Sequence, residues 1–440
     1  MVIKVKENDE KEMDQQINID RKDFYIANQN NSNFDEIQRL AIAYLNKQPV
    51  AIEGEPGVGK NQAIKILAKA LHKEPYRIRC TEETMARDII GGEKLAAEHS
   101  TNGSVATKTI FVPGKLMNGM QEGNLVILDE VNQLSPTVQK ALNSALEDHR
   151  TLGDIEGNID AKAHEEFGLF LTYNPDTGVA KYDLEVALRD RCKLLYFENI
   201  PPEIKLRIAL LRIPEFTLED IVQDSMLIRG IEKQDGTLNF VHYADNTWYE
   251  FNKNKKVESK SIHPYLYFDR KNESKLEFTN EKKHEYLQIG KAIVNALEEI
   301  GNLKRSGTKD LRRKLGSDYD EISRLNITSP SPRLINKLME DYVLLRNKGY
   351  TTGEILSDIA TTIVDYTVPA NERYIQVRAD TNIAQLVQKI CALYGLFDNS
   401  NIQELRSIIR IKSKESMITE FREKGYSASM AKKLVEEYAY

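Results

Sequence analysis

Cysteine is scarce in this chain, and the three cysteines lie far apart. Cys80, Cys192 and Cys391 form no metal-ligand spacing and no even set for disulfides, so a reducing compartment is the simplest context. The chain also lacks an apolar run of 18 or more residues and a signal-peptide pattern at its beginning. We therefore expect a cytoplasmic protein without a membrane span.

A strong excess of charge of one sign is missing as well. The net charge of −6 argues against a protein that binds nucleic acid over its whole surface, but it leaves room for a local basic patch. The 440 residues, 41% of them apolar, exclude a disordered chain and are enough for about three domains with cores. No internal repeat and no low-complexity tract interrupts the chain.

Short apolar runs alternate with helical patterns between residues 34 and 202. The runs are PVAIEG, YRIRC, NLVILDE, GLFLTYNP and KLLYFEN. This alternation predicts an α/β fold with a parallel sheet flanked by helices. Beyond residue 202 amphipathic helical patterns dominate, except at 236–283, where short aromatic and β-branched runs between polar turns predict a β-rich insertion.

These changes of pattern divide the chain into five parts. We expect an N-terminal extension (1–33), an α/β nucleotide-binding domain (34–202), a helical lid (203–235 and 284–368), the β-rich insertion (236–283) and a helical C-terminal domain (369–440).

The stretch GEPGVGKN follows the first strand pattern and precedes a helical one. Its glycines and Lys60 have the spacing of a phosphate-binding loop, in which backbone N–H groups and the start of the helix hold phosphate oxygens. The predicted binding residues are Gly54, Glu55, Pro56, Gly57, Val58, Gly59, Lys60, Asn61 and Gln62. Asn61 stands where Ser or Thr normally ligates magnesium, so the metal site is altered. A chance glycine-rich turn is the alternative.

The run LVILDE carries Asp129 and Glu130 to the end of a predicted central strand. Open α/β sheets bind ligands at this edge. Asp129 is therefore expected to hold Mg²⁺ through water, beside Asn61, and Glu130 to polarise the attacking water. The alternative is a strand that ends in solvated acids.

Four further polar residues are candidates for catalysis. Asn174 ends the strand pattern of GLFLTYNP, where it can orient water or merely open an Asn-Pro turn. Arg189 and Arg191 in ALRDRC can supply charge to a neighbouring subunit's transition state, and Arg333 in SPSPR begins a later helix from which it can reach a phosphate. Each arginine alone is equally consistent with a solvated surface side chain.

In this order, GEPGVGKN, LVILDEVNQLSPTVQKALNSALED, LTYNP, ALRDRC and SPR resemble the AAA+ ATPases, and more narrowly their MoxR-like branch with its dynein-related and midasin-type relatives. The resemblance covers about residues 34–230 and 285–368. It implies that Lys60 is the Walker A lysine, that Asp129 and Glu130 are the Walker B pair, and that Asn174 is sensor 1. It also implies that Arg191 is the arginine finger in preference to Arg189, that Arg333 is sensor 2, and that hairpins lie at 91–116 and 149–167.

The resemblance further implies ATP and Mg²⁺ as cofactors, a homo-oligomeric ring, most simply a hexamer, and a client protein, with a von Willebrand factor A domain protein as a common partner. Two alternatives stay open. One is a motor that acts on nucleic acid through the basic and aromatic residues of 251–283. If there is no such role, the aromatic side chains of this insertion pack in its core and its lysines face solvent. The other is a nucleotide switch that does not hydrolyse, because Asn61 departs from the family pattern.

Overall fold

The computed structural model describes most of the chain up to residue 396. The described ranges are 2–3, 17–18, 24–28, 34–99, 105–147, 151–153, 160–174, 182–222, 226–234, 237–243, 262–268, 275–305, 330–371, 373–374, 376–378 and 381–396. The chain divides into two compact units, Met1–His284 with Ser331–Asn336, and Glu285–Pro330 with Lys337–Tyr440. Residues 251–261 and 397–440 are not among the described ranges, so the expectations for them are not addressed by the structure.

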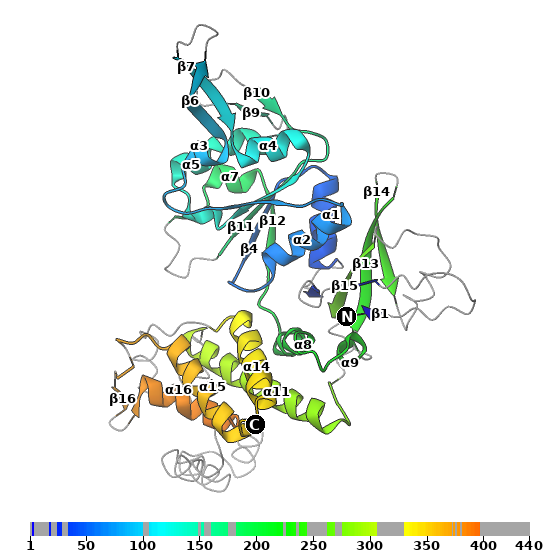
Figure 1. Cartoon of the computed structure of the whole chain (residues 1–440), viewed down its shortest axis with the longest axis vertical. Coiled ribbons are helices and arrows are strands. Elements are labelled where there is room, and N and C mark those ends of the chain that lie inside the picture. Colours follow the sequence, from blue (N-terminus) through cyan, green and yellow to red (C-terminus); the bar gives the residue numbers. More distant parts are fainter. Residues whose placement is uncertain are drawn as a thin grey trace, which may run out of the picture. The chain divides into compact units, whose positions relative to one another are not determined.

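A five-stranded parallel sheet forms the centre of the first unit (Figure 1). Its order is β12-β4-β11-β8-β5, and the strands are β4 Val50–Gly54, β5 Tyr76–Arg79, β8 Leu125–Asp129, β11 Gly168–Tyr173 and β12 Lys193–Phe197. All five coincide with the predicted apolar runs. Every residue of β8 and β11 is buried, as expected for central strands covered on both faces.

Helices cover both faces of this sheet. One core joins Val50 and Ile52 of β4 to helices α1 (Glu36–Leu45) and α2 (Lys60–Ala70). Ala51, which points the opposite way, belongs to a second core that contains the helices α3 Ala86–Ile89, α4 Lys115–Glu122, α5 Pro136–Ala141, α6 Asn143–Leu146 and α7 Val186–Asp190. Successive strand residues thus serve opposite cores, and the predicted α/β fold, a parallel sheet flanked by helices, is confirmed.

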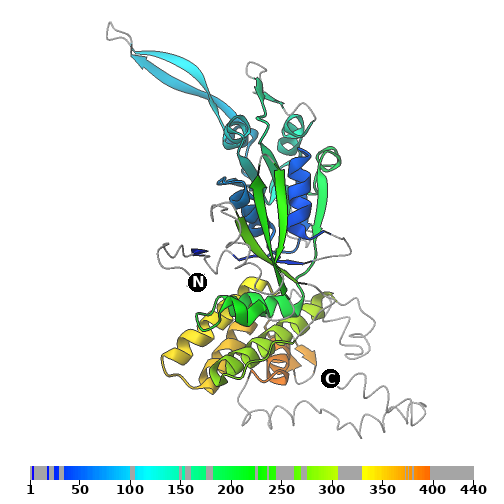
Figure 2. The same cartoon turned by 90° about the vertical axis from the view of Figure 1, so that its right-hand side faces the viewer.

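Both predicted hairpins are present. Strands β6 (Gly91–His99) and β7 (Val105–Pro113) pair antiparallel and extend away from the rest of the first unit (Figure 2). The shorter strands β9 (Thr151–Gly153) and β10 (Asp160–Lys162) form the second hairpin.

A second sheet lies in the first unit, and it differs from the predicted insertion in two ways. Its order is β14-β13-β15-β3, with β13 at Met226–Gln234, β14 at Thr237–Tyr243, β15 at Ile262–Phe268 and β3 at Ile26–Asn28. The predicted start at residue 236 is too late, because β13 occupies residues assigned to the helical lid. The N-terminal segment also contributes a strand, since β3 pairs in parallel with β15.

Asp35 ties this second sheet to helix α1. It is fully buried and caps the helix by accepting a hydrogen bond from the Gln38 backbone N–H at 2.8 Å. Its other oxygen accepts from Arg229 Nη1 at 2.6 Å and from the Tyr265 hydroxyl at 2.7 Å. A buried carboxylate needs such donors, so one side chain closes the contact between α1, β13 and β15.

Further helices complete the two units. Helices α8 (Pro202–Leu211) and α9 (Leu218–Val222), predicted as part of the lid, belong to the first unit. The second unit contains most of α11 (Glu281–Arg305) and α14 (Pro332–Asn347), together with α15 (Thr352–Thr367), α16 (Ile383–Leu393), β16 (Gln376–Arg378) and β17 (Thr381–Asn382). Where this region is described, it is helical apart from β16 and β17, and α16 packs on α15.

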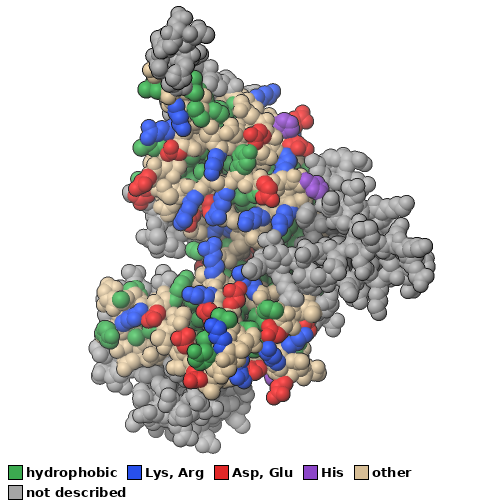
Figure 3. Space-filling model, viewed as in Figure 1, with side chains coloured by type: hydrophobic (Ala, Val, Ile, Leu, Met, Phe, Trp, Pro, Cys, Tyr) green, Lys and Arg blue, Asp and Glu red, His purple; other side chains and the backbone are tan. Residues whose placement is uncertain are grey.

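None of the helices among the described residues has both the length and the apolar content that a membrane crossing requires. Basic and acidic side chains are interspersed over the described surface seen in Figure 3.

Candidate nucleotide-binding site

The glycine loop runs from the end of β4 to the start of α2. Gly57 and Gly59 have positive φ angles of 87° and 94°, a region that other residues rarely adopt. A Cβ added at Gly57 would lie 2.9 Å from Pro332 Cδ, and one added at Gly59 would lie 2.9 Å from Tyr25 Cε2. The loop is therefore enclosed on one side by the first turn of α14 and on the other by the N-terminal segment.

Lys60 is the buried cation at the base of this loop. Its Nζ donates to the carbonyl oxygen of Gly54 at 2.5 Å, to that of Glu55 at 3.1 Å and to Asn174 Oδ1 at 2.9 Å. Burial lowers the pKa of its ammonium to about 8, although Asp129 and Glu130 oppose the shift. The structure thus brings together Lys60 and Asn174, which are 114 positions apart in the sequence.

Asp129 ends β8 with only 7% of its surface exposed. Its Oδ1 accepts from Thr172 Oγ1 at 2.7 Å and from Asn61 Nδ2 at 2.9 Å, and its Oδ2 accepts from Arg77 through Nε, at 3.0 Å, and Nη2. Burial alone raises the pKa of this carboxyl, but the hydrogen bonds from Thr172, Arg77 and Asn61 outweigh burial and hold the pKa below its usual range. Asp129 is therefore an ionised group with its acceptor positions in use.

Glu130 adopts a backbone conformation that is rare for its residue type. Its φ and ψ of 61° and 45° lie in the left-handed region, which costs a non-glycine residue about 1–3 kcal/mol in such sites. The side chain is 38% exposed, and its Oε2 lies 3.9 Å from Arg79 Nε. The carboxylate is thus beside the buried Asp129 but open to solvent.

A pocket of about 480 Å³ connects these groups, which is the size range of small-molecule sites. Its lining contains six basic side chains and two acidic ones, namely Lys60, Lys65, Arg77, Arg79, Arg212 and Arg333 against Asp129 and Glu130. Phe24, Tyr25, Ile26, Ile200 and Ile208 supply apolar walls. A pocket with this excess of positive charge suits a polyanion that carries an apolar group.

Most of the predicted binding residues border this pocket. Pro56, Gly57, Val58, Gly59, Lys60, Asn61 and Gln62 all line it, as do Asn174 and Arg333. Gly54 and Glu55 do not, but their carbonyl oxygens accept from Lys60. Tyr25, Arg77 and Thr172 also line the pocket, and their roles there were not predicted from the sequence. The arginines of YRIR, two residues apart on one strand, were the available signal for Arg77.

The two candidate finger residues lie elsewhere. Arg189 is in α7, and Arg191 is its C-cap; both are exposed, and neither lines the pocket. Arg191 donates to the Ala187 carbonyl oxygen at 2.8 Å and to Glu147 Oε1 at 3.2 Å. A role in this chain's own pocket is thus not supported for either arginine, and a role in a neighbouring subunit stays a prediction.

The predicted magnesium ligands fit a metal only in part. Asn61 Oδ1 is buried and has no hydrogen-bond partner among the described residues, as suits a ligand atom. The carboxylate of Asp129, however, offers about four acceptor positions, and four N–H and O–H groups already use them. No group of three or more His, Cys, Asp or Glu within the described ranges is placed to hold a metal. As arranged, this donor set does not fit Mg²⁺.

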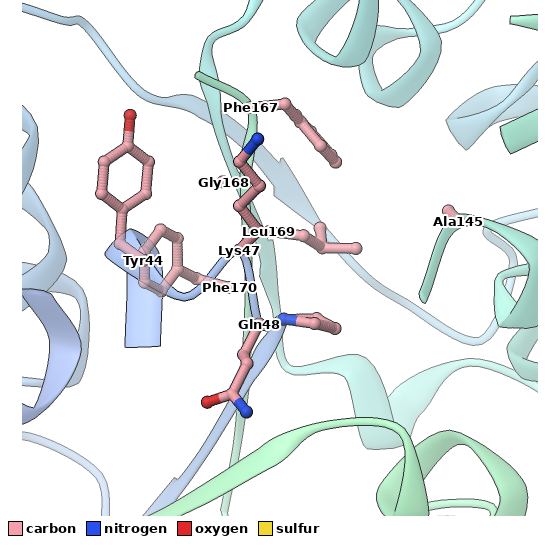
Figure 4. A pocket seen from close by; sticks show the side chains of 9 residues that line it. Tyr44, Lys47, Gln48, Ala145, Phe167, Gly168, Leu169 and Phe170 are labelled. Carbon is pink, nitrogen blue, oxygen red and sulfur yellow. The ribbon is translucent and has the colours of Figure 1, made fainter. Parts of the chain in front are cut away.

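A second cavity lies at the start of the strands, between Tyr44, Gln48 and residues 167–170 (Figure 4). Its volume of about 10 Å³ has room for one water molecule, so it is not a ligand site.

Residues 49–192 match the family of AAA domains described as the dynein-related subfamily. This part of the chain is a dynein-related AAA domain. The match contains the glycine loop, Asp129, Glu130, Asn174 and the two candidate finger arginines. The predicted MoxR-like AAA+ module is thereby confirmed.

Curated relatives of the AAA domain come from several organisms. Midasin from Giardia intestinalis is 32% identical over 137 residues, which are 31% of this chain and 3% of that protein. Protein CbbQ from Hydrogenophilus thermoluteolus is 28% identical over 177 residues, 40% of this chain and 62% of CbbQ. Protein NorQ from Paracoccus denitrificans is 25% identical over 237 residues, 52% of this chain and 84% of NorQ. The similarity thus spans less than two thirds of the first two relatives.

Proposed function

We propose that this protein binds ATP, hydrolyses it to ADP and phosphate, and uses the cycle to remodel a client protein. The observation that carries the proposal is the convergence of Lys60, Asn174, Asp129 and Glu130 on one basic pocket at the carboxyl ends of parallel strands. Open α/β sheets bind nucleotides at this edge. The dynein-related AAA domain supplies the matching family context.

In the proposed reaction, each residue has a defined task. The loop N–H groups and the start of α2 hold the phosphate oxygens. Lys60 exchanges its contacts with the Gly54 and Glu55 carbonyls for β- and γ-phosphate oxygens. Asn174 orients the attacking water, and Glu130 accepts its proton as the new bond to the γ-phosphorus forms and the bond to ADP breaks.

The remaining parts of the proposal concern assembly. Arg333 lines the pocket from the first turn of α14, which supports our proposal that it senses the γ-phosphate. Because Arg191 does not line its own pocket, we assign it to the pocket of the next subunit in a homo-oligomeric ring, most simply a hexamer. The client, a partner with a von Willebrand factor A domain and a cytoplasmic location are further expectations from the MoxR-like resemblance.

The alternative of a motor on nucleic acid has less support. Tyr265, Tyr267 and Phe268 were the aromatic candidates for stacking on bases, and all three are buried. Base stacking needs exposed rings. A nucleic-acid motor would instead show binding to single strands that weakens steeply with salt.

The decisive experiment measures phosphate release and nucleotide binding separately. Glu130→Gln should bind ATP like the parent but lose most hydrolysis, because the water loses its base. Glu83→Gln, which removes an exposed carboxylate outside the pocket, should hydrolyse at the parent rate. A parent that binds ATP but releases no phosphate would support a nucleotide switch instead. Client proteins can then be captured on Glu130→Gln in ATP and compared with capture in ADP.

A further inference from the structure

Asp129 has an internal cation as its partner. Arg77 reaches it from β5, which pairs in parallel with β8 so that Arg79 lies opposite Asp129 and Arg77 opposite Ile127. The Arg77 guanidinium uses both Nε and Nη2 on Oδ2 of Asp129. A paired donor of this kind fixes geometry as well as charge. Arg77 therefore occupies the carboxylate that would have to hold a metal or a metal-bound water.

The neighbouring Asn61 reinforces this arrangement. A hydroxyl at this position can ligate a metal directly, but Asn61 directs its NH₂ group at Oδ1 of Asp129, the oxygen that Arg77 leaves free. Thr172 takes the remaining position on Oδ1. All donors to the Asp129 carboxylate therefore come from the protein, and the three residues stand on three elements other than β8, namely α2, β5 and β11.

The charges that line the pocket also disfavour a divalent metal on Asp129. Nucleotide phosphates need positive charge around them, and this pocket supplies six basic side chains. A divalent ion on Asp129 would lie next to the Arg77 guanidinium, and like charges at this range repel strongly. Metal and Arg77 thus compete for one carboxylate.

We infer that Arg77 takes the place of the divalent cation on Asp129, so that this chain holds nucleotide phosphates without needing a metal, and a metal binds only when Arg77 leaves. The inference rests on the proposed nucleotide site and concerns its counterion. Arg77 is in this view a positioning residue: it sets the charge at Asp129 and faces the phosphates from the pocket wall.

The test compares Arg77→Gln with Arg79→Gln in the full chain. Both side chains line the pocket, and each substitution removes one positive charge from the same strand. Only Arg77 contacts Asp129; Arg79 lies near Glu130. Because the side chains of Arg77 and Arg79 are 52% and 74% exposed, both variants should fold, which thermal unfolding checks.

The first readout is the affinity for a fluorescent ADP analogue in EDTA and in Mg²⁺. The parent should bind with similar affinity in both buffers. Arg77→Gln should lose at least about tenfold in EDTA, the scale of one lost charge-assisted contact, and regain it in Mg²⁺. Arg79→Gln should bind the analogue more weakly than the parent in both buffers. The ratio of its affinities in Mg²⁺ and in EDTA should equal that of the parent. A parent that binds only with Mg²⁺, joined by two variants with equal ratios, overturns the inference.

The second readout needs no nucleotide. Binding of Mn²⁺, followed by its electron paramagnetic resonance signal, should be tighter for Arg77→Gln than for the parent and Arg79→Gln. Equal Mn²⁺ affinities in all three proteins would show that Arg77 does not compete for Asp129. If no protein binds the ADP analogue in either buffer, the proposed nucleotide function fails, while the Mn²⁺ measurement still decides the competition.

Discussion

The ring of Tyr25 lies against Gly59, the last residue of the glycine loop. A Cβ at Gly59 would come within 2.9 Å of Tyr25 Cε2, and the backbone there has φ +94°. The N-terminal segment therefore restricts the loop that is proposed to hold phosphate. Tyr25 is itself held, because its hydroxyl donates to Glu36 at the start of α1.

Gly59→Ala should both destabilise the protein and weaken nucleotide binding. The positive φ alone costs about 1 kcal/mol, and the clash with Tyr25 should raise the total to about 2–3 kcal/mol. Urea unfolding gives the loss of stability, and titration with a fluorescent nucleotide gives the loss of affinity.

Gly349 offers a matched control for the part of this stability loss that comes from the backbone conformation. It has φ +93°, but a Cβ there would meet nothing within 4 Å, so Gly349→Ala should carry the conformational cost alone. Removing the ring with Tyr25→Ala should bring the cost of Gly59→Ala down to that of Gly349→Ala. Equal costs of the two glycine substitutions in the parent would contradict a role for Tyr25.

Asp35 and its two partners, Arg229 and Tyr265, should contribute strongly to the stability of the second sheet. Arg229→Met leaves Asp35 buried without its ion-pair partner, which should lower the free energy of unfolding by about 3–5 kcal/mol. Tyr265→Phe removes one hydrogen bond and should cost about 1–2 kcal/mol. Chemical unfolding of the full chain measures both.

A double substitution tests whether the pair acts as a unit. Asp35→Asn can still cap α1, so combining it with Arg229→Met removes both charges and keeps the cap. The double variant should be clearly more stable than the sum of the two single losses predicts. Strict additivity would mean that the ion pair seen at 2.6 Å contributes nothing of its own.

The sequence was sufficient for the main sheet because its signal is local. The run LVILD is buried along all of β8. Ser135, a residue type that caps helices, and Pro136 in the first turn stand at the start of α5. Lys60 and Asn174 could be assigned to one site because each follows a strand of the same parallel sheet. Order along the chain and the direction of the strands fix such a site without knowledge of side-chain packing.

The N-terminal contribution could not be predicted in this way. β3 has three residues, too few for a periodic pattern, and its partner β15 lies more than 230 positions away. The role of Arg77 was hidden for another reason. Which way its side chain turns depends on the register between β5 and β8, and one residue of slip would direct it to the opposite face.

Arg191→Ala should bind nucleotide with nearly the parent's affinity but hydrolyse poorly. Its ion pair with Glu147 is exposed on the surface, so its loss should change stability by less than about 1 kcal/mol. An arginine that reaches a neighbour's phosphate can be worth about 10³–10⁵ in rate, and phosphate release measures this loss.

Mixing subunits separates a shared site from a damaged one. Arg191→Ala combined with Glu130→Gln should recover some turnover, because part of the junctions then contain an intact Glu130 and an intact Arg191. Arg189→Ala serves as the control. If Arg189→Ala carries the loss instead, the finger lies two residues earlier; if neither matters, hydrolysis does not use a shared site.

Asn61 should weaken the metal requirement of hydrolysis without abolishing the response to metal. Its Oδ1 is buried without a hydrogen-bond partner within the described part of the chain, while its Nδ2 occupies Asp129. Asn61→Thr supplies a hydroxyl closer to the backbone and releases one position on Asp129, so half-maximal hydrolysis should need less Mg²⁺. Asn61→Ala releases the same position but offers no ligand, so it should need more. Mn²⁺, which loses its hydration water more readily than Mg²⁺, should help the parent more than the Thr variant.

The measurement for Asn61 is ATP turnover against metal concentration for the parent and the two variants. Identical curves for all three would place residue 61 outside the metal environment. A parent without turnover at any metal concentration, beside a Thr variant that hydrolyses, would mean that Asn61 switches hydrolysis off. The protein would then be a nucleotide switch, because Lys60 and Glu130 would be present and correctly placed but ineffective until a hydroxyl replaced the amide.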